Sequence, residues 1–282
     1  MGEEVLVTEA EGVLEVTINR PEQRNAMTRD AARAIGAAMD RLEARDDLHC
    51  AILTGAGGFF CAGMDLKGFL RGELPVDERG GFGGICTWTP RKPVIAAVDG
   101  PALAGASNSR WPAISSSPAR ARFGIPEVKR GLVAAGGGVV QLPRLLPRAL
   151  AMELALTGDP ISAARALELG LINRITQSSA IEAARELARA ITGNGPLAVA
   201  ASKAIIRDSW HWPADEITAR QGPYIETIFS SEDARKARVP LRKSGPRAGR
   251  VGRFGAAIQR QRKTPPGPRT RGVFWNGGRS KD

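Results

Sequence analysis

The order of apolar and polar residues divides the N-terminal part of the chain into short strands and one amphipathic helix. Residues 5–8 and 13–18 alternate apolar and polar positions around Glu11-Gly12, which predicts a β-hairpin. Thr28 is a suitable N-cap for the helix that follows the polar loop 19–26. The spacing of the apolar residues gives this helix one buried face, formed by Ala32, Ile35, Ala38, Met39 and Leu42.

Two short apolar runs each end in a glycine turn. Residues 51–54 read as a buried strand closed by the turn at 55–58, and a helix is expected to begin near Asp65. Residues 93–98 form a second such run before the turn at 99–105. Backbone N–H groups left unpaired in turns of this kind can bind an anion or a developing oxyanion. The stretch around Asp65 lacks the P-loop lysine and the GxGxxG spacing, which argues against nucleotide phosphate binding.

The rest of the chain up to residue 234 reads mainly as helix. Residues 71–84 are rich in glycine and predict a mobile surface loop, which either covers a site or merely connects elements. A short strand is expected at 171–176. Apolar residues at helical spacing predict helices at 149–157, 162–169, 179–192, 197–209 and 214–234. Trp210 and Trp212 are expected to pack in the core.

Composition narrows the class of protein. With 282 residues, of which 43% are apolar, the chain can bury a sizeable core as one large domain or as a domain with an appendage. Its three cysteines have neither metal-ligand nor disulfide spacing, so no metal site is expected and a reduced, cytoplasmic setting is the default. The acidic N-terminus and the absence of a run of about 18 apolar residues argue against a secretory signal and a membrane span. The two histidines stand in neither a zinc nor a triad motif.

The positive charge of the chain is concentrated at its C-terminal end. Of the 40 basic and 29 acidic residues, fifteen basic and one acidic lie from residue 235 to 282, so this segment carries +14 and the preceding residues carry −3. We expect residues 236–282 to be a basic, disordered tail, because they are rich in Pro, Gly and Arg and lack apolar periodicity. Such a tail could bind nucleic acid through charge alone, but a solvated appendage is the simpler interpretation.

Four sequence segments together resemble one known family. They are 25–27 (NAM), 60–66 (FCAGMDL), 100–105 (GPALAG) and 123–128 (FGIPEV), the last followed by Gly131-Leu132 and by glycines at 136–138. In this order and spacing they are similar to the crotonase family, also called the enoyl-CoA hydratase/isomerase family, over roughly residues 5–235. The resemblance implies an α/β fold, a crotonase-like spiral of ββα units over residues 1–195, with a C-terminal helical region at 196–235.

The resemblance also implies the chemistry. Members bind an acyl-CoA thioester, so coenzyme A belongs to the substrate and no separate cofactor is expected. Two backbone N–H groups hold the enolate oxygen, and by motif these are on Met64 and Gly105. The residues that match positions at the CoA moiety are Arg24, Ala26, Ala62, Gly63, Asp65 and Leu66. Arg24 either contacts a phosphate or is an ordinary solvated charge. Homotrimers or hexamers are expected because similar proteins form them.

Glu127 matches a family catalytic carboxylate. In an apolar pocket its pKa would rise, which suits transfer of a proton to or from the carbon beside the thioester. The alternative is an acidic residue that merely opens a helix after Pro126. Family hydratases often use a second Glu, whereas this chain has Asn108 at that place. Without a second carboxylate the activation of water is harder, which favours an isomerase. Enoyl-CoA hydratase is still the first interpretation because it is the commonest activity in the family; a single-Glu enoyl-CoA isomerase is the second, and an inactive member the third.

Residues 106–118 depart from the family pattern. Pro112 interrupts a position where the family has an apolar helix, and Ser115-Ser116-Ser117 is a poor sequence for a buried strand. One hypothesis is a local reading-frame error, since a one-nucleotide shift with GC-rich codons can spell QLALACDLIV here. A second shift near Arg235 can spell EGPRAFAEKRAPRWTGR and then a stop, so the basic tail would come from the wrong frame. The coding DNA tests both ideas.

Overall fold

The computed structural model of the chain describes residues 3–88, 90–103, 113–115, 120–177 and 179–231. The chain divides into two units, residues 1–237 and 238–282, and every described residue belongs to the first. Gly105 and Asn108, most of segment 106–118 and the basic tail therefore lie outside the described residues.

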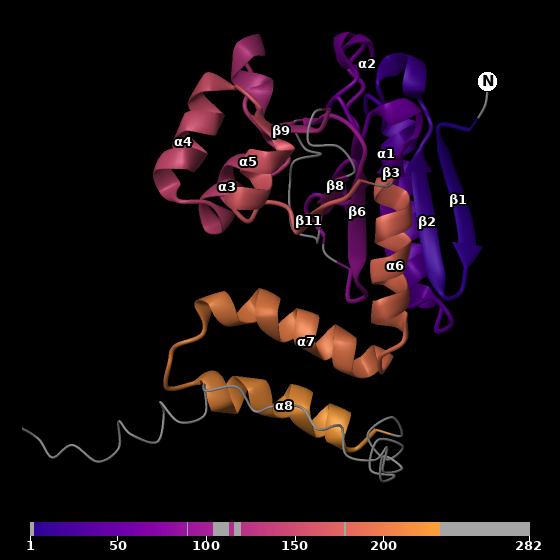
Figure 1. Ribbon diagram of the computed structural model, residues 1–282, viewed down its shortest axis with the longest axis vertical. Helices are drawn as coiled ribbons and strands as arrows, with labels where there is room; N and C mark the ends of the chain where they lie inside the picture. Colours follow the sequence, from indigo (N-terminus) through magenta and orange to yellow (C-terminus); the bar gives the residue numbers. More distant parts are fainter. Residues whose placement is uncertain (1–2, 89, 104–112, 116–119, 178, 232–282) are drawn as a thin grey trace, which may run out of the picture. The chain divides into compact units, whose positions relative to one another are not determined.

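A six-stranded sheet forms the centre of the fold (Figure 1). Its strand order is β1 (Val5–Ala10), β2 (Val13–Ile18), β3 (Cys50–Gly55), β6 (Val94–Val98), β8 (Ala113–Ser115) and β11 (Arg174–Ile175). The first pair is antiparallel, which confirms the hairpin, and its turn holds Glu11 and Gly12 at φ 51° and 77°. All other neighbouring pairs are parallel.

Helices cover both faces of this sheet. Along β3, Ala51 and Leu53 belong to the core cluster that includes the buried face of helix α1 (Arg29–Ala44). Cys50 and Ile52 point the other way, into a cluster with the alanines of α6 (Ala180–Thr192). Successive side chains of a strand alternate between faces, so a strand buried on both sides reads as one apolar run. The interpretation of residues 51–54 as a buried strand is confirmed.

Helix α1 begins as its sequence predicts. The Thr28 hydroxyl accepts a hydrogen bond from the Ala31 N–H at 3.0 Å and so caps the first turn. Ile35, Met39 and Leu42 have no exposed surface. The prediction of one apolar face is confirmed.

A second, smaller sheet carries the segments that precede the candidate site. It contains β7 (Ala102–Leu103), β9 (Arg122–Gly124) and β10 (Ile161–Ser162). Strand β9 pairs in parallel with β7 and antiparallel with β10. The 3₁₀ helix η4 (Pro126–Arg130), which holds Glu127, follows β9 directly.

The glycine-rich segment 71–84 is more ordered than its sequence predicts. It holds a two-stranded ribbon of β4 (Val76–Asp77) and β5 (Gly81–Phe82). Gly84 is buried, and a Cβ there would stand 2.2 Å from the Ala32 carbonyl oxygen of α1. The expectation of a mobile surface loop is therefore wrong for this end of the segment, because the missing side chain lets the backbone pack directly on the helix.

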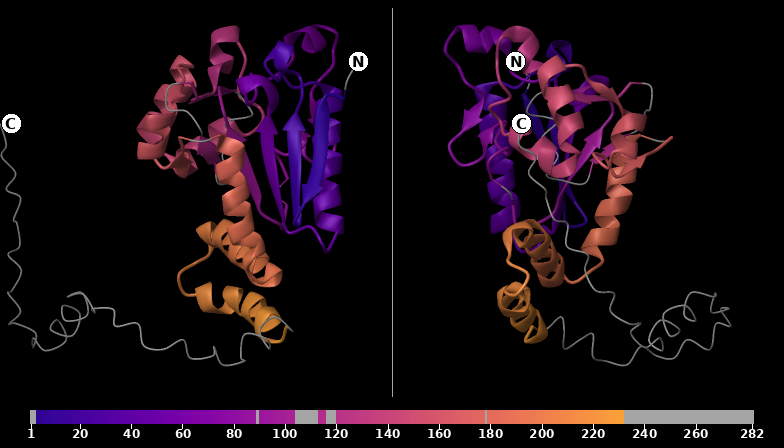
Figure 2. Two further views of the ribbon diagram at one scale, coloured as in Figure 1. Left: turned by 45° about the vertical axis from the view of Figure 1, so that its right-hand side comes forward. Right: turned by 90° about the vertical axis from the view of Figure 1, so that its left-hand side faces the viewer.

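The remaining helices are mostly those that the sequence predicts. They are α2 (Leu66–Leu70), α3 (Gly138–Leu145), α4 (Arg148–Thr157), α5 (Ala163–Glu168), α7 (Pro196–Asp208) and α8 (Ile217–Phe229), with 3₁₀ turns η1 (Pro21–Gln23), η2 (Ala56–Gly58) and η5 (Ser209–His211). Helices α7 and α8 lie side by side (Figures 1 and 2). None of the described helices is long and apolar enough to cross a bilayer.

Three features differ from what the sequence indicates. Helix α3 adds to the helices that the sequence predicts, although it begins at Gly138 and contains Pro143. Trp210 is 69% exposed and does not pack in the core, although Trp212 stacks on Tyr224. Ser115 ends a strand despite its poor strand sequence, since the parallel ladder of β8 with β6 and β11 is made by backbone groups.

Helix α6 takes its N-terminal cap from a distant part of the chain. The Asp99 carboxylate, at the end of β6, accepts a hydrogen bond from the Ala180 N–H at 3.0 Å. Ser179 occupies the N-cap position itself, but its hydroxyl makes no capping bond. The start of the helix is thus fixed by a side chain 81 residues away.

Replacing the cap should weaken the fold measurably. We expect Asp99→Ala to lower the free energy of unfolding by about 1 kcal/mol, because one N–H of the first turn loses its acceptor. Urea unfolding followed by circular dichroism measures the loss. Ser179→Ala is the matched control and should leave the unfolding midpoint unchanged. Equal losses in the two variants would contradict the assignment of the cap to Asp99.

Candidate active site

Three backbone segments run side by side toward the candidate site. Cys61 pairs in parallel with Ala102, and Ala102 pairs in parallel with Phe123. Met64, Gly105 and Glu127 follow these three residues by three or four positions along the chain. Parallel neighbours in such a ladder are about 4.8 Å apart and leave it at the same edge. Within the described ranges, the ladder therefore directs the segments that lead to Met64 and to Glu127 toward the same edge.

The Met64 N–H follows a sharp backbone turn at Gly63. Gly63 has φ +97°, a conformation that other residues adopt only under strain. Met27 uses both of its backbone groups on the neighbours of Met64: its N–H donates to the Gly63 carbonyl at 2.7 Å, and its carbonyl accepts from the Asp65 N–H at 2.9 Å. No acceptor for the Met64 N–H exists among the described residues. The turn thus presents an unused donor.

The helix after this turn contributes less than expected. Helix α2 spans only five residues, so its dipole is small. The second and third N–H groups of the helix, on Lys67 and Gly68, both donate to Asp65 Oδ1 at 3.0 Å. The expectation of free N–H groups at this helix start is therefore wrong for these two, because the Asp65 side chain accepts from them. The donor that the motif assigns to the thioester precedes the helix and belongs to Met64.

The structure brings most of the expected substrate-binding residues together. The Ala62 N–H donates to the Arg24 carbonyl at 3.1 Å, so segment 24–27 runs alongside segment 62–65. Leu66 is 43% exposed, whereas Gly63 is buried. The Arg24 side chain is exposed and lies over the Phe59 ring, 5.7 Å from its centroid. A phosphate contact by Arg24 stays a prediction.

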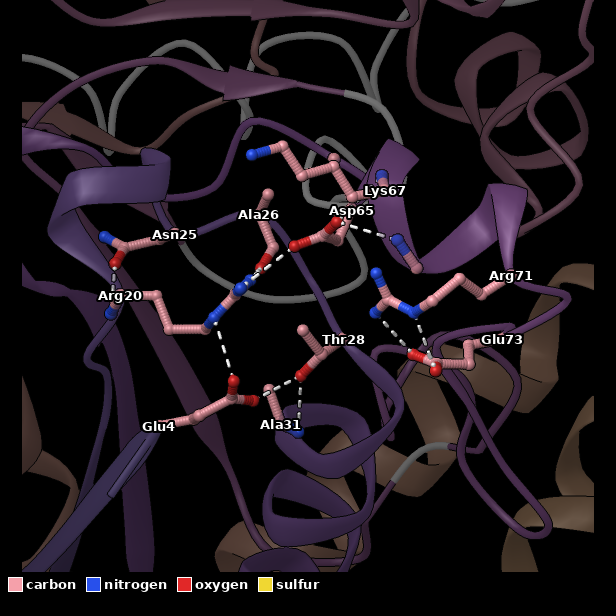
Figure 3. A network of polar contacts seen from close by, with 12 residues as sticks. Glu4, Arg20, Asn25, Ala26, Thr28, Ala31, Asp65, Lys67, Arg71 and Glu73 are labelled. Carbon is pink, nitrogen blue, oxygen red and sulfur yellow. Dashed lines mark hydrogen bonds and ion pairs between the residues drawn. The ribbon is translucent and has the colours of Figure 1, made fainter. Parts of the chain in front are cut away.

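An ion-pair network under the turn was not found from the sequence (Figure 3). The Arg20 guanidinium, only 13% exposed, pairs through Nη2 with Asp65 Oδ2 at 2.9 Å and through Nε with Glu4 Oε1 at 3.1 Å. It also donates to the Ala26 carbonyl. Both carboxyl oxygens of Asp65 are thereby engaged within the protein. Desolvation alone would raise the pKa of Asp65, but the hydrogen bonds from Gly68 and Arg20 outweigh it and lower the pKa.

Asn25 ties the two loops of the network together. Its side chain is completely buried, and its backbone is left-handed at φ 55°. Its Oδ1 accepts from the Arg20 N–H at 2.9 Å, while Nδ2 donates to the carbonyls of Ala56 and Phe59 at 2.9 and 2.7 Å. The loop that leads into the glycine turn is therefore held by side-chain bonds rather than by sheet pairing.

Glu127 has the environment of a proton-transfer residue. It stands in the first turn of η4 after Pro126, so the helix-opening interpretation is correct for its position. Its Oε2 atom is nevertheless buried and has no hydrogen-bond partner in the part of the chain that the structure describes. Burial raises the pKa of this carboxyl, as the sequence analysis expected. A buried carboxyl oxygen without a partner is costly for stability and typical of a functional site.

Two expected site residues are not placed. Gly105 and Asn108 lie outside the described residues, and the chain is described up to Leu103 on the side that leads to them. No group of three His, Cys, Asp or Glu side chains in the described ranges could hold a metal ion. The described part of the site thus consists of a free backbone N–H on one segment and a buried carboxyl on another.

Comparison with known proteins identifies the fold and the family. The chain matches the enoyl-CoA hydratase/isomerase family over residues 8–240. It is 40% identical over 257 residues to the enoyl-CoA hydratase EchA19 of Mycobacterium tuberculosis, covering 88% of this chain and 93% of the relative. A carnitinyl-CoA dehydratase of Salmonella typhi is 39% identical over 246 residues, covering 83% and 93%. A crystal structure of an enoyl-CoA hydratase from Mycobacterium tuberculosis H37Rv matches with a TM-score of 0.80 at 48% identity, covering 84% and 94%.

The fold is that of a crotonase-type protein, and the predicted α/β crotonase-like fold is confirmed. The chain belongs to the enoyl-CoA hydratase/isomerase family.

Removing the central cation of the network should destabilise the protein. Arg20→Met leaves the Glu4 and Asp65 carboxylates without their shared partner, and we expect a loss of about 3 kcal/mol at pH 7. The Asp65 contribution is present above its ordinary pKa of 3.8 and is lost as the pH falls through the lowered folded value, so the deficit should shrink in acid. Urea unfolding of the native protein and of Arg20→Met at pH 7 and at pH 3.5 measures the loss of stability and its decrease in acid. Arg24→Met, on an exposed side chain, should change stability by less than about 0.5 kcal/mol.

Glu127 should lower the free energy of unfolding as the pH rises, whereas the Asp65 contribution is lost as the pH falls. Its folded pKa is raised above the ordinary 4.5, so the folded state keeps a proton that the unfolded chain releases. Native stability relative to Glu127→Gln should therefore fall as the pH rises from about 4.5 through the folded pKa, and the Gln variant should melt higher at pH 8. Thermal unfolding between pH 4 and pH 8 checks this. A constant difference across that range would contradict a raised pKa.

Proposed function

We propose that the chain is an enoyl-CoA hydratase-type lyase, which reversibly adds water to the double bond of a 2-enoyl-CoA. The observation that carries this proposal is the buried, unpartnered Glu127 oxygen on a segment that the ladder aligns with the free Met64 N–H. Family membership supports it, as do the relatives named enoyl-CoA hydratase and carnitinyl-CoA dehydratase, which are lyase names.

In the proposed reaction, backbone N–H groups stabilise the negative charge on the thioester oxygen, and Glu127 transfers a proton to the α-carbon. Water oxygen adds to the β-carbon, and electron density moves to the thioester oxygen as an enolate. The Met64 N–H, with that of Gly105, donates to this oxygen, and one such donor is worth about 3 kcal/mol of transition-state stabilisation. Glu127 is protonated more readily than an exposed Glu and supplies the proton to the α-carbon. The attacking water releases its proton to the Glu127 carboxylate, so the carboxyl ends the cycle protonated as it began.

The same proposal assigns the substrate contacts. Arg24, Ala26, Ala62, Gly63, Asp65 and Leu66 would surround the CoA moiety. Asp65 would act through its backbone, because its carboxylate already binds Arg20 and caps α2. Coenzyme A is then part of the substrate, and no separate cofactor is required. Gly63 would matter for close approach of the thioester, since it carries no side chain.

The proposal also includes the oligomeric state of the protein and its compartment in the cell. We infer a homotrimer or hexamer, supported by the apolar side chains that α7, α8 and their connection leave exposed, among them Ile206, Trp210 and Phe229. We infer a cytoplasmic location, supported by three cysteines that are all buried and free.

An enoyl-CoA isomerase is the second candidate. Position 108 is Asn, so the sequence supplies no second carboxylate there to activate water. Moving one proton between carbons needs only Glu127. The two candidates differ in substrate and share the same N–H donors and the same carboxyl.

Absorbance of the conjugated thioester distinguishes the candidates. Loss of absorbance from crotonyl-CoA indicates hydration, and its appearance from a 3-enoyl-CoA indicates isomerisation. Glu127→Gln should reduce the observed activity by at least about 100-fold, because proton transfer loses its acid. Glu153→Gln, on the exposed side of α4, is the control and should retain full activity. Activity that survives Glu127→Gln would remove Glu127 from the mechanism, and no change with either substrate would support an inactive family member.

A further inference from the structure

Cys61 stands where the two glycine turns are joined. Its backbone N–H donates to the Pro101 carbonyl at 3.2 Å, and its carbonyl accepts from the Leu103 N–H at 3.0 Å, so its backbone is paired with the segment of the second turn. Its side chain turns toward the first. The Gly63 N–H donates to the thiol sulfur at 3.4 Å, and the thiol donates to the Gly63 carbonyl oxygen at 3.7 Å. Cys61 itself is 1% exposed.

The Gly63 carbonyl and the Met64 N–H belong to one peptide group. A trans peptide is planar, and its C=O and N–H bonds point in opposite directions. Donors that hold the Gly63 oxygen therefore also aim the Met64 N–H. Two groups do so, the Met27 N–H at 2.7 Å and the Cys61 thiol. Hydrogen bonds to a carbonyl also polarise the amide, which makes its own N–H a better donor.

The thiol keeps its proton under ordinary conditions. Burial raises the pKa of Cys61 to about 11, so the group is a neutral donor at neutral pH and not a thiolate. A buried neutral thiol beside an apolar cavity of about 30 Å³, which Cys61, Phe60 and Met27 help to line, is also well placed to fill space. Packing and positioning therefore make different predictions for serine, which is smaller than cysteine but keeps a hydrogen-bond donor.

We propose that Cys61 is a positioning residue for the proposed reaction, whose thiol fixes the Gly63–Met64 peptide so that the Met64 N–H points at the thioester oxygen as it becomes an enolate. This inference rests on the proposed function. It acts through backbone atoms, so Cys61 itself touches no reacting group. Its effect belongs to the transition state, since the charge on the oxygen is largest there.

Three variants separate positioning from packing. Cys61→Ala removes both thiol bonds, and we expect kcat for crotonyl-CoA hydration, or for 3-enoyl-CoA isomerisation if that is the activity, to fall about tenfold with KM within about twofold. Cys61→Ser keeps a donor and an acceptor and should restore kcat to within about threefold of native. Cys50→Ala is the matched control: Cys50 is equally buried, on the opposite face of the sheet, and its loss should leave kcat unchanged.

The infrared spectrum of a bound ligand that does not react provides a second test, which is independent of catalytic turnover. In butyryl-CoA labelled with ¹³C at the thioester carbonyl, binding to the native protein should lower the infrared C=O stretching frequency, because the N–H donors polarise that bond. Cys61→Ala should move the frequency back toward that of free butyryl-CoA, and Cys61→Ser should not. This measurement applies even to a variant with reduced thermal stability, provided that it still binds the ligand.

The outcomes distinguish the inference from the function on which it rests. A native protein that neither converts an enoyl-CoA nor shifts the bound carbonyl would overturn both. A native protein that does so, with Cys61→Ala equal to it in kcat and in carbonyl frequency, would overturn the role of Cys61 alone. So would a serine variant as impaired as the alanine variant, since packing does not depend on a donor.

Discussion

Parallel backbone pairing is the constraint on which the candidate site depends. Cys61, Ala102 and Phe123 form one row of this pairing, and Met27 with Met64 forms another beside it. Each row fixes the direction in which a turn leaves the sheet and which backbone groups stay free. Because the proposed donors are backbone N–H groups, the side chains at these positions matter mainly through the conformations that they permit. Gly63 permits φ +97°, and Gly84 lets a loop rest against α1.

Local patterns were sufficient to predict the parts of the molecule that local physics determines. The hairpin, the Thr28 cap and the buried strands follow from alternation, capping chemistry and apolar runs within a few residues. The raised pKa of Glu127 was expected only through the resemblance to the family, which singled out this carboxyl. The Arg20 network could not be found in this way, because it joins Glu4, Arg20 and Asp65 across a large sequence separation. Nothing in the loop sequence distinguishes Arg20 from its charged neighbours Glu22 and Arg24.

Other misses share this non-local origin. Helix α3 forms although its sequence holds glycines and Pro143, since tertiary packing of Leu142 outweighs intrinsic propensity. Strand β8 forms on backbone pairing with two neighbours that the sequence of the strand does not reveal. Asp65 resembles a ligand-binding residue by motif, yet its carboxylate is fully used inside the protein. Motif position therefore predicts where a residue lies more reliably than what its side chain contacts.

The distant cap of α6 has a consequence for the order of folding. A helix capped by its own preceding residue can begin to form as soon as its sequence has been made. Helix α6 receives its cap from Asp99, which directly follows β6, a strand paired with β3 in the sheet. Closing a loop of this length costs conformational entropy before the hydrogen bond and the packing of the helix offset that cost. We therefore expect α6 to become stable late, on a sheet that is already assembled. On the ribosome, the face of β3 and β6 that α6 covers would remain uncovered until then, which makes it a natural surface for chaperone contact.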